Sequence, residues 1–469
     1  MSSTEVHLVI LAAGHGTRMK STLAKVLHPV AGRPMLEHVL RACDEVAPTT
    51  VTVVIGHKAN SVREWLETPS RSADRQNIQC VVQSPQLGTG HALRQAETVL
   101  SGRTGTIVLL SGDVPLLTGV TLRRLVQEHQ NAGAAATVVT AVMDHPHGYG
   151  RILRSNGHIA GIVEQRDATP EQQLIREVNS GIYAFDAAPL FDSLRGIAAG
   201  NAQGEYYLTD IVALYRARDL PVGTLIVDDP REVHGVNNRS ELAAVNGIMR
   251  QKKNEELMTS GVTIIDPSST YIGIDVTIGP DTVIHPGVII EGRTHVGSGC
   301  EIHAYTRIGD SELADRVTLL NFCVIAGARI AEGASIGPFA HLRPTTDVGQ
   351  SAKVGNFVEL KNTSLGAGSK ASHLSYLGDA TIGADVNVGA GTITCNYDGK
   401  NKHQTVIEDG AFIGSDSQLI APVRVGRGAY VGAGSSITRD VPPGALGIAR
   451  GRQHNVENWT DRKKPAPKG

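Results

Sequence analysis

Residues 11–34, LAAGHGTRMKSTLAKVLHPVAGRP, combine two closely spaced glycines with basic side chains. Gly14 and Gly16 would let the backbone approach a phosphate closely, with N–H groups directed at the anion. Arg18 and Lys25 add positive charge to the same segment. The segment lacks both the G-x-x-x-x-G-K-[ST] loop and the third glycine of a dinucleotide fingerprint. It is a candidate phosphate site, although two glycines alone would equally fit a turn between a strand and a helix.

Two other side chains could take part in catalysis. Asp113 ends the apolar segment TIVLLSGD, and a carboxylate at the carboxyl end of a strand can hold Mg²⁺. Alternatively, Asp113 could be an ordinary turn residue before Val114. His373 lies in SHLSYLGD, and a neutral imidazole can accept a proton from an attacking amine. One histidine among 18 is ordinarily a surface or packing residue.

The elements that must position these groups change character along the chain. Up to Asn237, near-continuous apolar runs alternate with amphipathic segments such as PMLEHVLRACDEV and HALRQAETVL. The apolar runs are VHLVILAA, TVTVVIG, IQCVVQ, TIVLLSGD and AATVVTAV. Strands that are apolar on both sides and separated by helices predict a parallel sheet covered on both faces. Residues 1–237 are therefore predicted to form a Rossmann-like α/β domain.

A helical linker is predicted over residues 238–260. Its apolar residues recur at helical spacing, Asn238 and Glu241 form a plausible capping pair, and Gly261 is a plausible stop.

A six-residue period then follows, with interruptions, as far as Ile437. Aliphatic residues recur every six positions from Ile272 to Ile308, from Val324 to Leu360 and from Ile407 to Ile437. This period predicts a parallel β-helix over residues 261–469, with the aliphatic side chains pointing inward. Residues 309–323 and 395–406 interrupt the period and are predicted to leave the prism as loops. The tail DRKKPAPKG is predicted to be disordered.

Composition excludes several classes of protein. The formal charge is −2, from 44 basic and 46 acidic side chains, which argues against a nucleic-acid partner. The five cysteines form no C-x-x-C pair, so a disulfide framework and a thiolate zinc site are disfavoured. The apolar run from Leu8 to Ala13 is too short to span a membrane. We therefore expect a cytoplasmic protein with reduced thiols and no membrane partner.

Further segments follow in a specific order: QSPQLGTGHA, LLSGDVPLL, GYGRI, IVEQRDA, EVNSGIYAF and VNN, and then HLRPTTD, FVELKN, SHLSYLGD and TITCNYDG. Together they make the chain resemble, from about residue 5 to residue 455, the bacterial bifunctional N-acetylglucosamine-1-phosphate uridyltransferases/glucosamine-1-phosphate acetyltransferases. Ser111 stands where a tyrosine is common in this family. The resemblance implies that the β-helix is left-handed, with about 18 residues a turn.

The resemblance also implies two reactions. Glucosamine 1-phosphate is acetylated from acetyl-CoA, and the product then receives a uridylyl group from UTP with release of pyrophosphate. The sugar nucleotide would supply peptidoglycan and lipopolysaccharide synthesis, and hence cell-wall biogenesis and cell shape. A homotrimer formed through the β-helix is implied as well, with small molecules as the other partners.

Site residues follow from matching positions. His373, Arg18 and Lys25 would be catalytic, with Glu359 orienting or polarising the site of His373. Mg²⁺ would be held by Asp113 and Asn237, although an asparagine here could also be a helix cap. The nucleotide and sugar would contact Leu11, Ala12, Ala13, Gly14, Lys25, Gln83, Gly88, Thr89, Ser111, Gly112, Asp113, Gly150, Glu164, Asn179 and Asn237. The substrate that accepts the acetyl group would contact Arg343, Lys361, Tyr376 and Asn387. Acetyl-CoA would contact Ala390, Asn396, Tyr397, Ser415, Ala433 and Arg450.

Two alternatives stay open at this level. One is a sugar-1-phosphate nucleotidyltransferase with a single activity and a regulatory β-helix. The other is a binding or assembly protein with degenerate sites, against which the intact Arg18, Lys25, Asp113 and His373 argue. Thioester consumption with glucosamine 1-phosphate, and Mg²⁺-dependent pyrophosphate release, separate the three hypotheses.

Overall fold

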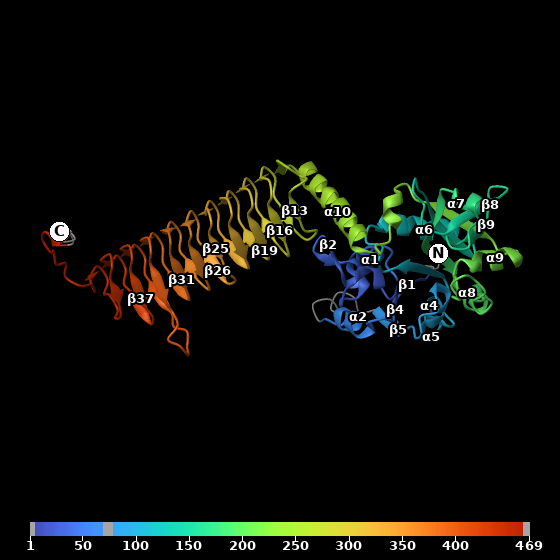
Figure 1. Cartoon of the computed structure of the whole chain (residues 1–469), viewed down its shortest axis with the longest axis horizontal. Coiled ribbons are helices and arrows are strands. Elements are labelled where there is room, and N and C mark those ends of the chain that lie inside the picture. The colour runs from blue at the N-terminus through green and yellow to red at the C-terminus, as the bar shows by residue number, and fades with distance from the viewer. Residues whose placement is uncertain (1–4, 69–77, 463–469) are drawn as a thin grey trace, which may run out of the picture. The chain divides into compact units, whose positions relative to one another are not determined.

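The computed structural model describes residues 5–68 and 78–462 (Figure 1). The chain divides into two compact units, residues 1–249 and 250–469, and the division falls within helix α10 (Arg239–Thr259).

A mixed β-sheet forms the centre of the first unit. Its strands run in the order β11 (Val222–Ile226), β7 (Ala136–Val142), β10 (Glu177–Asp186), β6 (Thr106–Ser111), β1 (Val6–Ala12), β4 (Thr50–Ile55) and β5 (Ile78–Val82), and β8 (Arg151–Ser155) and β9 (His158–Val163) join at β10. The predicted parallel arrangement is confirmed for β1, β4, β5 and β6. It is wrong for β10, which runs antiparallel to both β6 and β7. An apolar run carries no information about strand direction, which explains the difference.

Helices cover both faces of this sheet, as the apolar strands predict. On one side, Leu8 and Ile10 of β1 pack in a core with side chains of α1 (Met35–Asp44) and α6 (Gly119–Ala132). On the other, Val9 packs with α4 (Thr89–Gln95), α8 (Ala187–Leu194) and α9 (Asp210–Ala217). Neighbouring residues of a strand point to opposite faces, so one strand serves both cores.

The remaining elements of the first unit are short. They are α2 (Ala59–Leu66), α5 (Glu97–Leu100), α7 (Pro170–Gln173), the 3₁₀ turns η1 (Thr17–Met19), η2 (Lys25–Leu27) and η3 (Pro230–Val233), and the hairpin β2 (Pro29–Val30) with β3 (Arg33–Pro34). Helix α10 begins after Asn238, whose side-chain oxygen accepts a 2.9 Å hydrogen bond from the Glu241 N–H. The predicted cap is thus confirmed, and Gly261 beyond the helix has a φ of 97°.

The second unit is a parallel β-helix built from three sheets (Figure 1). Sheet I contains β12 (Thr263–Ile264), β15 (Val283–Ile284), β18 (Glu301–Ile302), β21 (Thr318–Leu319), β24 (Ser335–Ile336), β27 (Lys353–Asn356), β30 (Lys370–His373), β33 (Asn387–Val388), β36 (Phe412–Ile413), β39 (Tyr430–Val431) and β41 (Leu446–Gly447). Sheet II contains β13 (Tyr271–Ile272), β16 (Ile289–Glu291), β19 (Arg307–Gly309), β22 (Val324–Ala326), β25 (His341–Leu342), β28 (Glu359–Lys361), β31 (Tyr376–Gly378), β34 (Ile393–Cys395), β37 (Gln418–Ile420) and β40 (Ser436–Ile437). Sheet III contains β14 (Thr277–Ile278), β17 (His295–Val296), β20 (Glu312–Leu313), β23 (Ala328–Ile330), β26 (Thr346–Val348), β29 (Ser364–Leu365), β32 (Ala380–Ile382), β35 (Thr405–Ile407) and β38 (Val423–Val425).

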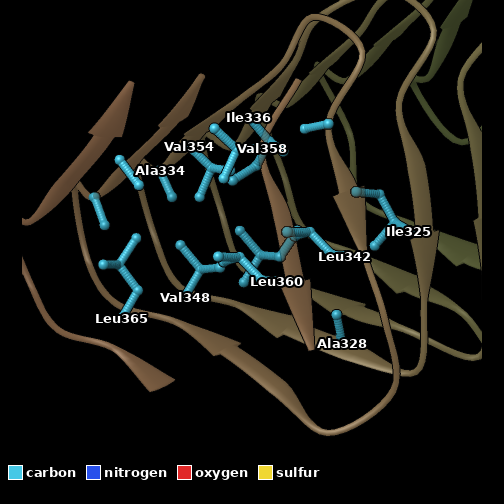
Figure 2. Close-up of a cluster of buried hydrophobic side chains, with 14 of the residues drawn as sticks. Ile325, Ala328, Ala334, Ile336, Leu342, Val348, Val354, Val358, Leu360 and Leu365 are labelled. Atoms are coloured by element: carbon cyan, nitrogen blue, oxygen red, sulfur yellow. The ribbon is translucent and has the colours of Figure 1, made fainter. Parts of the chain in front are cut away.

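Most of the short strands contribute an aliphatic side chain to the interior. Figure 2 shows the labelled side chains, among them Leu342 and Leu360, clustered inside the coils. Up to β37 each strand of the β-helix pairs with the third strand after it, so that equivalent residues of successive coils stack, and β39 pairs with β41. The β-helix prediction is confirmed in its period, its parallel strands and its inward aliphatic residues.

Two details of the predicted register are wrong. Ile325, 1% exposed, points inward at β22, whereas Val324 is 43% exposed. Residues 309–323 stay within the prism as β20 and β21, because the inward position advances by five residues from Ile308 to Leu313. The second predicted loop is confirmed, since residues 396–404 leave the prism between β34 and β35.

The end of the chain is only partly described. Asp461 and Arg462, which fall in the tail predicted to be disordered, belong to the short helix α11 (Trp459–Arg462), and residues 463–469 lie outside the described residues. Among the helices that the structure describes, none is long and apolar enough to cross a membrane.

Candidate active sites

A cavity of about 330 Å³ lies in the first unit at the carboxyl ends of β1, β5 and β6. This is the edge of an α/β sheet where ligands bind. The predicted residues that line it are Leu11, Ala12, Ala13, Gly14, Lys25, Gln83, Gly88, Thr89, Ser111 and Asp113. Gly112 lies beside them, because its N–H donates a 2.9 Å hydrogen bond to the Leu11 carbonyl. Sequence reasoning missed five further lining residues, which are His15, Val26, Gln86, Ala92 and Glu205.

The two glycines of the first loop serve different purposes. A Cβ on Gly14 would meet nothing within 4 Å, so no neighbour in the described chain requires a glycine there. Gly16 has a φ of 61°, and a Cβ there would lie 2.9 Å from the Lys25 Cβ. Gly16 therefore lets the loop close against Lys25, and Gly14 leaves the backbone accessible to a ligand. Arg18 is exposed in η1 and is not part of the cavity wall.

Lys25 and Asp113 line this cavity, and Asn237, which is not part of its wall, contacts Lys25 from a third part of the chain. The Lys25 ammonium forms an ion pair with the Asp113 carboxylate and donates a 2.8 Å hydrogen bond to Oδ1 of Asn237. The Val236 N–H donates to the Asp113 carbonyl at 2.9 Å, which holds the two segments together. Because Asn238 caps α10, the Asn237 side-chain oxygen is not used as the cap and accepts the hydrogen bond from Lys25. A carboxylate and an amide oxygen already surround a cation here, so the donor set fits Mg²⁺.

The opposite wall of the cavity contains the residues predicted to recognise the base. Gly88 has a φ of 103°, and a Cβ there would lie 2.8 Å from the Tyr206 carbonyl oxygen. The Gln83 amide donates a 3.0 Å hydrogen bond to the Gly88 carbonyl, and the Thr89 hydroxyl accepts one from the Leu208 N–H. These contacts fix the loop beside a cavity whose walls combine hydrogen-bond donors and acceptors.

Gly150, Glu164 and Asn179 form a second group in the same unit. The Asn179 N–H donates to the Gly150 carbonyl at 2.9 Å, and a Cβ on Gly150 would lie 3.5 Å from both Glu164 carboxylate oxygens. The carboxylate accepts a hydrogen bond from the Thr209 hydroxyl and lines a cavity of about 370 Å³. Burial raises the pKa of Glu164 above its ordinary value, and the Thr209 hydrogen bond opposes that rise only in part.

A residue that sequence reasoning missed supports this group. The Arg151 side chain is fully buried, and its guanidinium donates to the Tyr149 carbonyl and, at 2.8 Å, to Oε1 of Gln165. Burial lowers the pKa of Arg151. Since Arg151 follows Gly150 directly, it fixes the turn that contains that glycine. The segment GYGRI was the only signal in the sequence.

In the β-helix, three of the four residues predicted to bind the substrate of acetylation lie on or next to neighbouring strands of sheet II. Arg343 follows β25, Glu359 and Lys361 belong to β28, and Tyr376 begins β31. Arg343 forms a 3.0 Å ion pair with Glu359, which is in register with Tyr376. Asn387 lies on the adjoining sheet I, in β33. The four charged or aromatic side chains therefore share one outer surface.

The Tyr376 hydroxyl lies close to the loop 396–404. A Cβ on Gly378 would lie 2.4 Å from that oxygen and 2.9 Å from the Asn396 amide nitrogen, so Gly378 provides the space for both. Burial opposes ionisation of Asp379, but hydrogen bonds from Asn362 and Asn396 and the charges of Lys402 and Lys361 lower its pKa. Tyr397, the other loop residue predicted to contact acetyl-CoA, is 62% exposed.

His373 is the last residue of β30, at the corner where sheet I ends. Its Nδ1 is 2.5 Å from Oδ1 of Asn356, the equivalent residue one coil earlier. With an acceptor at Nδ1, the neutral ring carries its proton there and leaves the Nε2 lone pair free. Asn356 was missed by sequence reasoning.

The acetyl-CoA residues continue the same corner along the β-helix. The carbonyls of Asn356, His373, Ala390 and Ser415 each accept a hydrogen bond from the next coil, donated by Leu374, Gly391, Asp416 and Gly434. Arg450 closes the series, because its guanidinium donates to the Ala433 carbonyl at 2.7 Å. We call this series the corner column. It places the imidazole at one end and a guanidinium at the other, with small side chains between them.

These two units define a transferase that combines a nucleotidyltransferase with a hexapeptide-repeat acyltransferase. Residues 8–178 match the MobA-like NTP transferase domain, and residues 275–310 and 404–439 match the bacterial transferase hexapeptide repeat. The chain belongs to the family of bifunctional GlmU proteins, because curated relatives match both units over nearly their whole length.

Three of these relatives illustrate the similarity. The bifunctional protein GlmU of Pelobacter propionicus is 49% identical over 98% of this chain and 99% of its own. That of Trichlorobacter lovleyi is 50% identical over 97% of this chain and 98% of its own. That of Syntrophotalea carbinolica is 50% identical over 99% of both chains. A solved UDP-glucose pyrophosphorylase complexed with UDP-glucose is 17% identical over 53% of this chain and 99% of its own, with a TM-score of 0.44, a similarity too weak to bear on function.

Proposed function

We propose that the first unit transfers a uridylyl group from UTP to N-acetylglucosamine 1-phosphate and releases pyrophosphate. The convergence of Lys25, Asp113 and Asn237 at the edge of the sheet carries this proposal. An oxygen of the sugar phosphate attacks the α-phosphorus of UTP, a new P–O bond forms, and the bond to pyrophosphate breaks. Both reactants are anions, so catalysis consists mainly of positioning them and neutralising their charge.

Each group of residues has a part in that step. Backbone N–H groups around Gly14, together with Arg18 and Lys25, hold the triphosphate and the departing pyrophosphate. Gln83, Gly88 and Thr89 hold uracil. Gly150, Glu164 and Asn179 hold the sugar. Asp113 and Asn237 would hold Mg²⁺, which when bound supplies charge neutralisation at the phosphates.

We propose that the β-helix acetylates glucosamine 1-phosphate from acetyl-CoA. Nε2 of His373 takes a proton from the amine as its nitrogen forms a C–N bond with the thioester carbonyl; the C–S bond breaks, and the imidazolium returns the proton to the leaving sulfur of coenzyme A. Asn356 keeps the imidazole in the required tautomer. Arg343 and Lys361 hold the sugar phosphate beside Tyr376 and Asn387. The corner column and the loop residues Asn396 and Tyr397 hold coenzyme A, with Arg450 near one of its phosphates.

The order of the two reactions follows from their products. N-acetylglucosamine 1-phosphate, made by the second unit, is the substrate of the first. The resulting sugar nucleotide would feed peptidoglycan and lipopolysaccharide synthesis, and so cell-wall biogenesis and cell shape. We further propose a cytoplasmic homotrimer assembled through the β-helix. The five cysteines are all free, in keeping with a reducing compartment, and burial raises the pKa of Cys323 to about 11.

One experiment tests both halves. The purified protein is incubated with acetyl-CoA, glucosamine 1-phosphate, UTP and Mg²⁺, and free thiol and pyrophosphate are followed separately. Free thiol should appear even when UTP is left out. Pyrophosphate should appear when N-acetylglucosamine 1-phosphate replaces both acetyl-CoA and glucosamine 1-phosphate. Pyrophosphate without thiol would favour the single-activity nucleotidyltransferase, and the absence of both would favour a binding protein.

A further inference from the structure

Three potential metal ligands converge on the outer face of sheet I, several coils before the corner column. His285 follows β15, Glu301 begins β18, and His303 follows β18. Ile284 and Ile302 are in register, which places His285 and His303 at the same position of successive coils. The two imidazoles stack with ring centroids 4.5 Å apart and an interplanar angle of 9°.

Both imidazoles direct a nitrogen at the same carboxylate oxygen. Nε2 of His285 lies 3.4 Å and Nε2 of His303 lies 3.3 Å from Oε1 of Glu301. The ligand atoms of all three residues lie within 4.8 Å of one another. Ligands at about 2.0–2.1 Å from a tetrahedral zinc ion are separated by about 3.3–3.4 Å. The two nitrogen–oxygen separations therefore already match the edges of such a tetrahedron.

The backbone holds these ligands in place. The His285 N–H donates to the Ile302 carbonyl and the His303 N–H to the Leu319 carbonyl, both within the hydrogen-bonded ladder of sheet I. The two histidine side chains are only 26% and 24% exposed, so each is partly packed, while Glu301 is 50% exposed. A metal ion bound here would need little rearrangement and would connect two consecutive coils.

We propose that His285, Glu301 and His303 form a binding site for a divalent transition metal of the Zn²⁺ class. Two imidazoles and one carboxylate suit such ions and do not suit Mg²⁺ or Ca²⁺, which favour all-oxygen ligand sets. Three protein ligands leave a fourth position for water. The site is separate from the residues proposed for both transfer reactions, and its role is to fasten the first coils of the β-helix.

The test uses the full-length protein, stripped with a chelator, and Zn²⁺ alone as the probe. The background carries Asp113→Ala, which removes the metal ligand of the nucleotidyltransferase site. Zn²⁺ binding is measured by competition with a chromophoric chelator, and Co²⁺ substitution reports imidazole ligands by its visible spectrum. We expect one saturable Zn²⁺ per chain and a higher unfolding temperature with Zn²⁺, since a metal that binds only the folded state stabilises it.

His285→Ala and His303→Ala should each weaken Zn²⁺ binding at least tenfold and remove the thermal shift, because each deletes one of three ligands. His295→Ala is the matched control. That histidine lies on sheet III, where its Nδ1 is 2.8 Å from the Thr277 hydroxyl, and its loss should leave Zn²⁺ binding unchanged. Acetyl transfer measured on every variant verifies folding. Undiminished Zn²⁺ binding in the His285→Ala/His303→Ala double variant, or no saturable site in the parent, would overturn the proposal.

Discussion

The ammonium of Lys25 donates a 2.8 Å hydrogen bond to Oδ1 of Asn237, although 212 residues separate the two along the chain. The same ammonium pairs with Asp113, so it contacts both side chains proposed to hold the metal. Metal binding and movement of Lys25 toward the nucleotide phosphates are therefore coupled in our proposal.

This coupling predicts an unusual effect of Lys25→Met. Removing the ammonium leaves Asp113 and Asn237 free, so the nucleotide-free protein should bind Mn²⁺ more tightly than the parent does. Uridylyl transfer should nevertheless fall by about 10²–10³, because a donor to the phosphates is lost. Mn²⁺ affinity by electron paramagnetic resonance and pyrophosphate release are the two measurements. Weaker Mn²⁺ binding in the variant would contradict the coupling.

Asp113→Ala should abolish metal-dependent pyrophosphate release and spare acetyl transfer. The carboxylate is the charged member of the proposed metal site, and Asn237 alone is a weak ligand. Pyrophosphate and free thiol are assayed on one preparation. Equal loss of both activities would indicate misfolding instead.

His373→Ala should slow acetyl transfer by about 10²–10⁴, the usual contribution of a general base, and leave uridylyl transfer unchanged. Asn356→Asp tests the positioning role separately. An added carboxylate beside Nδ1 stabilises the imidazolium, so the acid limb of the pH–rate profile for acetyl transfer should move to higher pH. An unchanged profile would mean that Asn356 does not act through His373.

Glu164→Gln should make the first unit less sensitive to pH. Because burial raises the pKa of Glu164 in the folded state, the folded protein holds this proton more tightly than the unfolded chain does. The free energy of unfolding therefore decreases as pH rises from the unfolded pKa through the folded pKa. Relative to the parent, Glu164→Gln should be more stabilising at pH 7 than at pH 4, which urea titrations at the two pH values can measure. A difference independent of pH would contradict the assignment.

The inward register of β22 can be tested with adjacent residues. Ile325→Ala removes a side chain that is 1% exposed and should cost about 2–5 kcal/mol in the free energy of unfolding. Val324→Ala, at a position that is 43% exposed, should change it by about 0.5 kcal/mol or less. Chemical unfolding followed by circular dichroism compares the two. Similar losses would contradict the register.

The architecture of the β-helix could be predicted because a narrow interior accepts one aliphatic side chain per short strand, and that requirement repeats in the sequence. The misplaced inward residue at Val324 has a physical origin. Two aliphatic side chains stand next to each other there, and only the stacking of coils decides which one turns inward. The five-residue steps, such as that from Ile308 to Leu313, need the same knowledge of the stacked coils.

The residues of the candidate sites also divide into those that could be predicted from the sequence and those that could not. Most residues of the nucleotide cavity lie in loops at the ends of strands. These loops coincide with the sequence segments on which the site was predicted. Arg151 and Asn356 contact other residues of the sites through hydrogen bonds, and although Arg151 lies in GYGRI, neither role can be read from a sequence segment. Asn356 could have been found by its offset, because it precedes His373 by one coil. The direct contact of Lys25 with Asn237 depends on the folded path between them and could not be read from either segment.

Residues of the corner column are separated by whole numbers of coils. Successive strands of a sheet lie about 4.8 Å apart, so the span from His373 to Arg450 can change only in increments of that size while the core stays intact. Removal of one complete coil between them would bring the guanidinium nearer to the imidazole without leaving a hole in the interior. If the column holds coenzyme A as we propose, removing a repeat would shorten the space for the thioester carrier and leave the reacting groups themselves unaltered.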